Sequence, residues 1–299
     1  MKTLTNDLLS NRMKSLMAAL FVMIFAASCG EEDPVLGDDE TLNFEVDEAN
    51  AETEATIESA MDDIDNITEA GMDFANVAGR HRDSELLECA EVTHDEENQT
   101  ITIDYGDGCE GRRGRMRSGK IIITYTGRSL EPGSVKTVTM EDFMVDEVAI
   151  AGTRIKTNLM MTEDDTPVFR IQLVGGSATF PDGTVATRES DLTRTWIRGE
   201  DELSDESYVE GTSSGLNREG NTYETTILER IVYKRDCGRL LKFLPVSGVK
   251  EIVINGGESV ITYDYGDGEC DNLVTINTDG VSEEVEINPR RLKHIAKRG

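Results

Sequence analysis

The sequence contains few of the residues that most enzymes use for chemistry. In 299 residues it has three histidines, one tryptophan and six prolines. His81, His94 and His294 do not occur at the spacing of a zinc motif, and the chain has no GxSxG elbow, Walker loop or Rossmann glycine fingerprint. These absences predict a protein that is not an enzyme. A carboxylate-dependent hydrolase of glycans stays open because acidic residues are abundant, although the lone Trp196 argues against an aromatic sugar cleft.

Basic residues are scarce relative to acidic ones. The chain has 30 Lys and Arg against 59 Asp and Glu, which gives a net charge of −29. Residues 1–28 carry a net charge of +2, so the rest of the chain carries −31. Nucleic-acid binding depends on cations that neutralise phosphates, so this balance argues against nucleic acid as a partner and against docking on anionic headgroups. It fits a well-solvated surface.

The chain has one long apolar run, Leu16–Ala27, which follows a basic start. The run is shorter than the ~20 residues that span a membrane, so residues 1–28 are predicted to be a secretory signal peptide. The small residues before Cys29 (Ala-Ala-Ser-Cys) resemble a lipobox, which predicts cleavage before Cys29 and a lipid anchor on its sulfur. Two or three acyl chains would hold the protein firmly at a membrane. The alternative is ordinary cleavage nearby, with Cys29 as an unmodified thiol.

Acidic residues follow this cysteine at Glu31, Glu32 and Asp33. Such a cluster resembles the surface-export signal of Bacteroidetes-type lipoproteins, which implies the outer membrane of the cell envelope and exposure at the cell surface. The alternative is a solvated start to residues 29–49, which we expect to form a flexible acidic tether.

A helix is predicted at about residues 50–72. Ile57, Met61, Ile64 and Ile67 recur at steps of four and three, so they share one helical face. We expect this face to pack on a sheet and the acidic residues between them to face water. A partner-binding helix is the alternative.

From about residue 99 the hydrophobic pattern changes to period two, which indicates β-strands. Gly- and Asn-containing turns at 181–183, 218–221 and 255–257 separate them, and strands joined so tightly are antiparallel. Residues 50–288 are therefore predicted to be one mainly β domain, an antiparallel meander with one N-terminal helix. A curled sheet, an open barrel and a sandwich all remain open, and the alternation favours a sheet with one wet face. Residues 289–299 form a basic tail. The predicted strands are Gln99–Tyr105, Lys120–Thr126, Val135–Val145, Thr153–Met160, Val168–Val174, Ala178–Phe180, Thr184–Ile197, Tyr208–Ser214, Thr222–Arg235, Val249–Ile254, Ser259–Tyr265, Leu273–Thr278 and Ser282–Ile287.

One sequence occurs twice, as TITIDYGDG at 100–108 and as VITYDYGDG at 260–268. The echo suggests two related halves, about 85–145 and 235–288. Each copy has one cysteine just after it and another upstream, and four cysteines in an exported protein predict two disulfides. Of the three pairings, the repeat favours Cys89–Cys109 and Cys237–Cys270, each contributing roughly 3 kcal/mol. Reduced thiols are the alternative.

The repeated Asp-Tyr-Gly-Asp-Gly has two interpretations. It can end a strand in a sharp turn, with Asp side chains bonded to backbone amides, and here it is similar to the turn of PKD-type β-sandwiches. It can also bind calcium as a cofactor, through Asp104 and Asp107 in the first copy and Asp264 and Asp267 in the second. The acidic spacing is not that of an EF-hand loop, and two carboxylates are few for a calcium ion, so we favour the turn.

A basic loop follows the first copy of the repeat. Its cations are Arg112, Arg113, Arg115, Arg117 and Lys120. They are a candidate anion-binding site for a phosphate or a sulfated glycan. The interpretation that we favour is that they pair with the protein's own acidic residues.

Over most of the part after Cys29 the chain resembles uncharacterised Bacteroidetes-type cell-envelope lipoproteins. The resemblance rests on the acidic residues after Cys29, on TITIDYGDGC (100–109), on FPDGT (180–184) and on GTSSGLNREG (211–220). It implies a β-rich envelope protein and no catalytic residues. We expect a non-enzymatic binding or structural module at the membrane, holding a glycan, lipid or protein ligand. The alternatives are a calcium-stabilised adhesin-like domain and the glycan hydrolase.

Overall fold

The computed structural model describes residues 38–76, 85–111, 114–161, 166–201, 203–237 and 244–287. The chain divides into two compact units, Met1–Leu42 and Asn43–Gly299. Of the first unit only residues 38–42 are described, as the start of a helix, and the second unit contains every described strand. The predicted signal peptide, the lipidation site Cys29, Arg112, Arg113 and the basic tail 289–299 lie outside the described residues.

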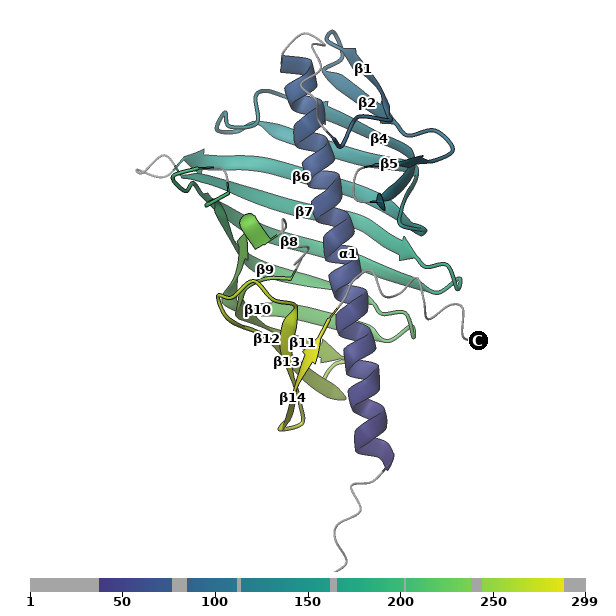
Figure 1. Cartoon of the computed structure of the whole chain (residues 1–299), viewed down its shortest axis with the longest axis vertical. Helices are drawn as coiled ribbons and strands as arrows, with labels where there is room; N and C mark the ends of the chain where they lie inside the picture. The colour runs from purple at the N-terminus through teal and green to yellow at the C-terminus, as the bar shows by residue number, and fades with distance from the viewer. Residues whose placement is uncertain are drawn as a thin grey trace, which may run out of the picture. The chain divides into compact units, whose positions relative to one another are not determined.

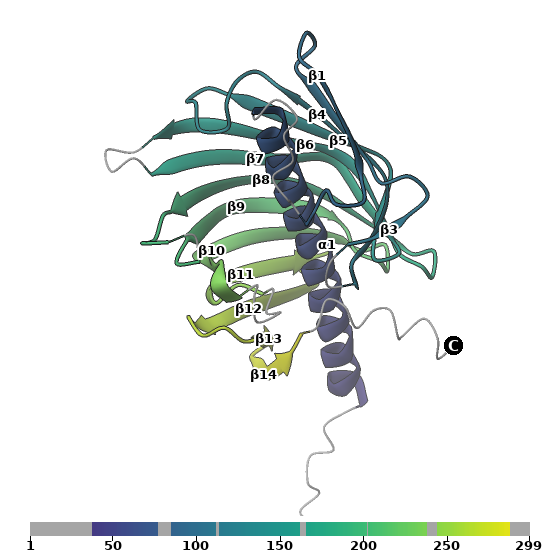
Figure 2. The same cartoon turned by 45° about the horizontal axis from the view of Figure 1, so that its top comes forward.

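The described strands form one antiparallel sheet of 14 strands. Its strands follow one another in chain order, except that the short β3 pairs only with β4. β1 and β14 are free edges, so the described sheet is open and gently curved, neither a closed barrel nor a two-sheet sandwich (Figures 1 and 2). This confirms the mainly β, antiparallel meander. The strands are β1 (Glu91–Asp95), β2 (Thr100–Asp104), β3 (Cys109–Glu110), β4 (Met116–Tyr125), β5 (Val135–Val145), β6 (Val148–Met161), β7 (Pro167–Thr179), β8 (Val185–Ile197), β9 (Glu206–Leu216), β10 (Thr222–Lys234), β11 (Ser247–Ile254), β12 (Ser259–Asp267), β13 (Leu273–Thr278) and β14 (Val281–Glu286).

Most strands lie where the period-two pattern places them, and β5 and β13 have the predicted bounds. Gly183, Gly220 and Asn255 have φ values of 85°, 83° and 46°, the left-handed conformation that such turns require. The two strands predicted at 168–174 and 178–180 are one strand, β7, because its pairing with β8 continues through a bulge. β1 and β3 were not predicted.

The helix α1 (Asp38–Asn76) is longer than predicted. Residues 38–49 were expected to belong to the tether, and the structure places them in the helix instead. The sequence offers a reason. No glycine or proline occurs between Gly37 and Gly71, so nothing in residues 38–49 prevents the helix from beginning there.

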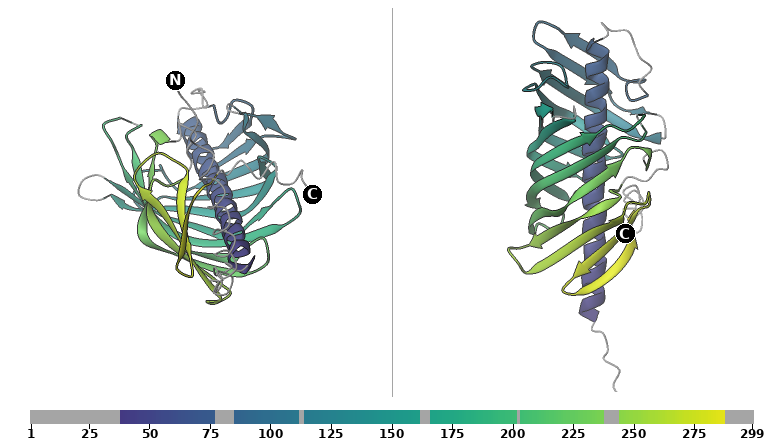
Figure 3. Two further views of the ribbon diagram at one scale, coloured as in Figure 1. Left: turned by 60° about the horizontal axis from the view of Figure 1, so that its bottom comes forward. Right: turned by 90° about the vertical axis from the view of Figure 1, so that its left-hand side faces the viewer.

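Within the second unit, α1 crosses one face of the sheet, which we call the inner face (Figures 1 and 3). Ile57, Met61, Ile64 and Ile67 are all buried, as the helical spacing predicted, and Ile64 and Ile67 have no exposed surface. They join an apolar cluster with residues of β2, β4, β5, β6, β7 and β8. A second apolar cluster involves Ala51 and Ala55 of the helix and residues of β9 to β13.

The helix lies close to the sheet at Gly71. A Cβ atom built there would lie 2.9 Å from Cδ1 of Ile103 and 3.2 Å from Cδ1 of Ile123. Both isoleucines are fully buried, so neither has room to move aside. A glycine therefore suits the position where the helix backbone rests on β2 and β4, because any side chain there would displace the ends of these isoleucines.

The opposite face of the sheet, which we call the outer face, is rich in threonine. Thr100, Thr124 and Thr137 are direct neighbours across β2, β4 and β5, and Thr212 and Thr226 are neighbours across β9 and β10. These positions alternate with buried inward residues along each strand, which confirms the predicted sheet with one wet face.

Candidate functional site

Acidic residues form a stripe along the helix. Glu54, Glu58, Asp62, Asp65 and Glu69 recur at steps of four, four, three and four, so they project from one side of α1. The expectation that such residues face water was wrong for this stripe, because it contacts Arg and Lys side chains on the inner face of the sheet. We call this interface the ion-pair seam. It brings together charged side chains from α1, β5, β6, β8 and β11, and it is the candidate functional site.

The first part of the seam is centred on Glu54. Its carboxylate accepts a hydrogen bond from Arg188 of β8 and one of 2.9 Å from Lys250 of β11. Lys250 also donates to Glu58 at 3.2 Å. Burial alone would raise the pKa of Glu54, but the two cations outweigh it and lower the pKa to about 2. Glu54 and Glu58 likewise hold the pKa of Lys250 well above its usual value, although burial opposes them.

The middle of the seam is centred on Asp65. Arg154 of β6 binds its carboxylate with both ends of the guanidinium fork, at 2.6 and 2.8 Å. Arg194 of β8 donates to Asp62 at 3.1 Å and lies 3.7 Å from Asp65. Burial favours the neutral form of Asp65, yet Arg154 holds its pKa well below the usual range. Two-point binding of this kind fixes orientation as well as charge.

The last part of the seam lies near the end of the helix. Glu69 contacts Lys136 of β5 and accepts a 2.9 Å hydrogen bond from Lys156 of β6. Against burial, these two cations lower the pKa of Glu69 to about 2. Each inward cation of the sheet thus meets an acidic partner on the helix.

A further acidic residue of the helix, Asp63, binds the predicted basic loop. Arg117 donates two hydrogen bonds of 2.7 Å to its carboxylate, and Arg115 lies 3.7 Å away. Lys120 pairs instead with Asp104, at 2.8 Å. For these three cations the structure confirms the interpretation that the loop pairs with the protein's own acids. Anion binding at Arg112 and Arg113 stays a prediction.

The seam holds charge and is poorly suited to transferring protons. Every shifted carboxylate in it has a lowered pKa, and the pKa values of the arginines at 188 and 194 are raised further above neutrality despite burial. Burial also raises the pKa of Tyr233 and Tyr265, which line the same region. Among the shifts in the seam, only that of Lys136 points toward neutrality, because burial lowers its pKa, and its contact with Glu69 opposes this by favouring the charged ammonium.

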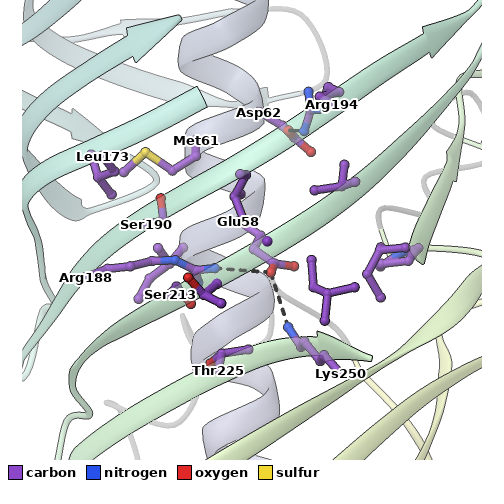
Figure 4. A pocket seen from close by; sticks show the side chains of 18 of the residues that line it. Glu58, Met61, Asp62, Leu173, Arg188, Ser190, Arg194, Ser213, Thr225 and Lys250 are labelled. Carbon is purple, nitrogen blue, oxygen red and sulfur yellow. Dashed lines mark hydrogen bonds and ion pairs between the residues drawn. The ribbon is translucent and has the colours of Figure 1, made fainter. Parts of the chain in front are cut away.

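A small cavity lies in the seam, between the helix and β8, β9 and β10 (Figure 4). Its volume is about 60 Å³. Glu58 and Met61 face it from the helix, and Ser190, Ser213 and Thr225 face it from the sheet. Pockets for small-molecule ligands usually measure at least ~300 Å³, so this cavity is too small for a lipid chain or a sugar.

Both copies of the repeated motif make the same hydrogen bond from aspartate to backbone amide, although β2 ends at Asp104 whereas β12 continues to Asp267. The carboxylate of Asp104 accepts a hydrogen bond of 2.8 Å from the amide of Gly106, and Asp264 accepts one of 2.9 Å from Gly266. This is the backbone bonding that the structural interpretation predicts.

The predicted calcium ligands do not gather into a larger group. Among the described residues, the one set of three potential metal ligands is Asp236 with Cys237 and Cys270. Those two cysteines are joined in a disulfide and offer no thiolate. Asp104, Asp107, Asp264 and Asp267 therefore stay candidate calcium ligands on sequence grounds alone.

Both predicted disulfides are present. Cys89 bonds Cys109 and Cys237 bonds Cys270, with Cα atoms 6.0 and 5.2 Å apart. The first connects the segment after the helix to β3, and the second connects the end of β10 to the loop before β13. Each bridge lies beside one copy of the repeated turn.

The cations of the seam were missed in the sequence, although their spacing contains a signal. Lys136 is in phase with the buried Val138, and Lys250 is in phase with the buried Ile252. In a strand, residues two apart share a face, so these lysines must point inward with the core. An inward lysine requires an acidic partner, and the acidic stripe of the helix could have been matched to it.

Among the described residues, none of the helical segments combines the length and apolar character needed to cross a membrane. No protein-family model matches the chain, and no curated protein and no solved structure matches it.

Proposed function

We propose that this chain is a non-enzymatic binding or structural module, anchored by lipid on Cys29 at the outer membrane and exposed at the cell surface. The observation that carries the proposal is that an ion-paired helix fills the inner face of the sheet. A carrier of lipid needs a hollow apolar face, and the cavity of about 60 Å³ gives no such space. The threonine-rich outer face is left for a glycan or protein partner.

The electrostatics of the seam support a role other than catalysis. Its carboxylates and cations stabilise each other in their charged forms, so they brace the helix on the sheet. Buried pairs of this kind are better evidence for a fixed geometry than for added stability, because desolvation offsets much of their attraction. A rigid sheet with a fixed helix suits a protein that presents a surface.

The proposed localisation rests on sequence features, and the two disulfides are consistent with it. The signal peptide, the lipobox-like residues before Cys29 and the acidic residues after it favour a lipoprotein of the outer membrane. The two disulfides support a compartment outside the cytoplasm, where such bonds persist.

Mass spectrometry of the protein from bacterial membranes tests the anchor. We expect a mature N-terminus at Cys29 that carries acyl chains. Cys29→Ala should move the protein from the membrane fraction to the soluble fraction, whereas Ser28→Ala, which keeps a small residue before the cleavage point, should not. An unmodified Cys29, or cleavage elsewhere, would overturn the proposed anchor.

Surface exposure has a separate test. Protease added to intact cells should degrade the protein when Glu31, Glu32 and Asp33 are present. Replacing all three by alanine should protect it while leaving the lipid in place. If both forms resist the protease equally, the domain lies on the periplasmic side of the outer membrane, which contradicts its exposure at the cell surface.

A further inference from the structure

Three polar groups in the cavity have no hydrogen-bond partner among the described residues. They are Oγ of Ser213, Oγ1 of Thr225 and Nε of Arg194. The side chains of Ser213 and Thr225 are 6 % and 4 % exposed, so bulk water does not solvate them. Buried polar atoms are nearly always hydrogen-bonded, and because these three atoms line one cavity, their partners should lie within it.

Two of these groups, the hydroxyls of Ser213 and Thr225, are close neighbours because of the strand register. Ser190 of β8 pairs with Ser213 of β9, and Ser213 pairs with Thr225 of β10. Their hydroxyls therefore form a row across three adjacent strands on the inner face. Small side chains in this row, opposite Glu58 and Met61, leave the space that forms the cavity (Figure 4).

The charges around the cavity balance, which argues against an ionic ligand. Arg154, Arg188, Arg194 and Lys250 line it, together with the carboxylates of Glu58 and Asp62. The same cations are also bound by Glu54 and Asp65, so four cations meet four carboxylates. An added anion or cation would be a buried charge without a counter-charge. A neutral ligand that both donates and accepts hydrogen bonds is favoured.

We infer that the cavity is an internal hydration site. Its volume of about 60 Å³ is enough for water, since a cavity needs roughly 15 Å³ to hold a first molecule. Ser213, Thr225 and Nε of Arg194 donate to these waters, and the waters donate to the carboxylate of Glu58. The site lies between the two apolar clusters, so water separates the cores under the two halves of the sheet.

Thr225→Val tests the hydration site, because a hydrated cavity and a dry cavity predict changes of opposite sign in the melting temperature. In a hydrated cavity the valine removes a partner of the waters, and the melting temperature falls by several degrees. In a dry cavity the valine replaces an unbonded hydroxyl by a methyl group of similar size, and the melting temperature rises. Thr226→Val, the next residue along β10 on the outer face, is the control for the strand preference of valine.

A second pair of variants repeats the test on β9. Ser213→Ala should lower the melting temperature relative to Ser214→Ala, which changes the adjacent hydroxyl on the outer face. A rise for both Thr225→Val and Ser213→Ala over their controls would overturn the inference.

A crystal structure of the full mature protein provides a test that does not depend on variants. We expect discrete water density within about 3.2 Å of the Ser213 and Thr225 hydroxyls. Crystals soaked in bromide should give no anomalous peak in the cavity. A dry cavity, or a bromide peak there, would overturn the hydration site, and neither result would affect the lipid anchor or the outer face.

Discussion

Glu54→Gln removes one charge from the ion-pair seam and keeps the shape of the side chain. The pKa of Glu54 falls from its ordinary value of 4.5 to about 2 in the folded protein. At about 1.4 kcal/mol for each tenfold change in proton affinity, this corresponds to about 3 kcal/mol of stability at pH 7. The Glu54 side chain is 12 % exposed and Lys250 is 4 % exposed, so solvent screens the pair little. Loss of the carboxylate also leaves two buried cations without their main partner, a change that typically costs 3–5 kcal/mol.

The sign of the pH dependence follows from the same shift. Because the folded-state pKa lies below the unfolded one, the stabilisation is complete above about pH 4.5 and is lost as the pH falls toward 2. Urea unfolding followed by circular dichroism should show about 3 kcal/mol less stability for Glu54→Gln at pH 7, and a smaller difference from wild type at pH 3. The control is Asp73→Asn. Asp73 is an exposed residue on the same helix, so this variant should be as stable as wild type. Equal stability of Glu54→Gln and wild type at pH 7 would refute the assignment of a stabilising charge to the seam.

Further predictions concern the core, the disulfides and the repeated turn. Ile64→Ala should lose about 2–5 kcal/mol in urea unfolding, because the side chain is fully buried; a loss below 1 kcal/mol would contradict the packing of the helix. Gly71→Leu should lose about 1–3 kcal/mol by the same assay, since its side chain would collide with Ile103, and a neutral result would show that the helix can shift. Replacing Cys237 and Cys270 together by serine should lower stability by roughly 3 kcal/mol, and the difference should shrink when wild type is measured under reducing conditions. EDTA should leave the melting temperature unchanged, because Asp104 is already bonded to Gly106 and Lys120, and a rise on adding calcium would instead favour the adhesin-like alternative.

The sheet could be predicted because its signals are local. Alternation of polar and apolar residues marks a strand within a few positions, and residues such as Gly183 and Asn255 mark the turns through their conformational preferences. β1 (Glu91–Asp95) was missed because it is an edge strand that buries none of its side chains fully, so it shows little apolar alternation. β3 has two residues and gives no periodic signal.

The seam could not be predicted in the same way, since its partners are far apart in the chain. Charged residues on a helix usually face solvent, and only contact with the sheet reverses this rule for Glu54 and Asp65. The disulfides were predictable because the repeat restricts their pairing. The missing step for the seam was to treat Lys136 and Lys250 as inward residues, which their phase along the strands indicates.

The meander and the helix impose different demands on the order of folding. Each strand pairs with the one synthesised just before it, so the sheet can grow as the chain emerges. The helix is synthesised before any strand, yet Glu54 must find partners 134 and 196 residues later in the chain. Such non-local contacts form late and slow folding. The ion pairs of Glu54 can therefore form only after β8 and β11 have been synthesised, whereas the apolar contacts of Ile64 and Ile67 with β2 and β4 need far less of the chain.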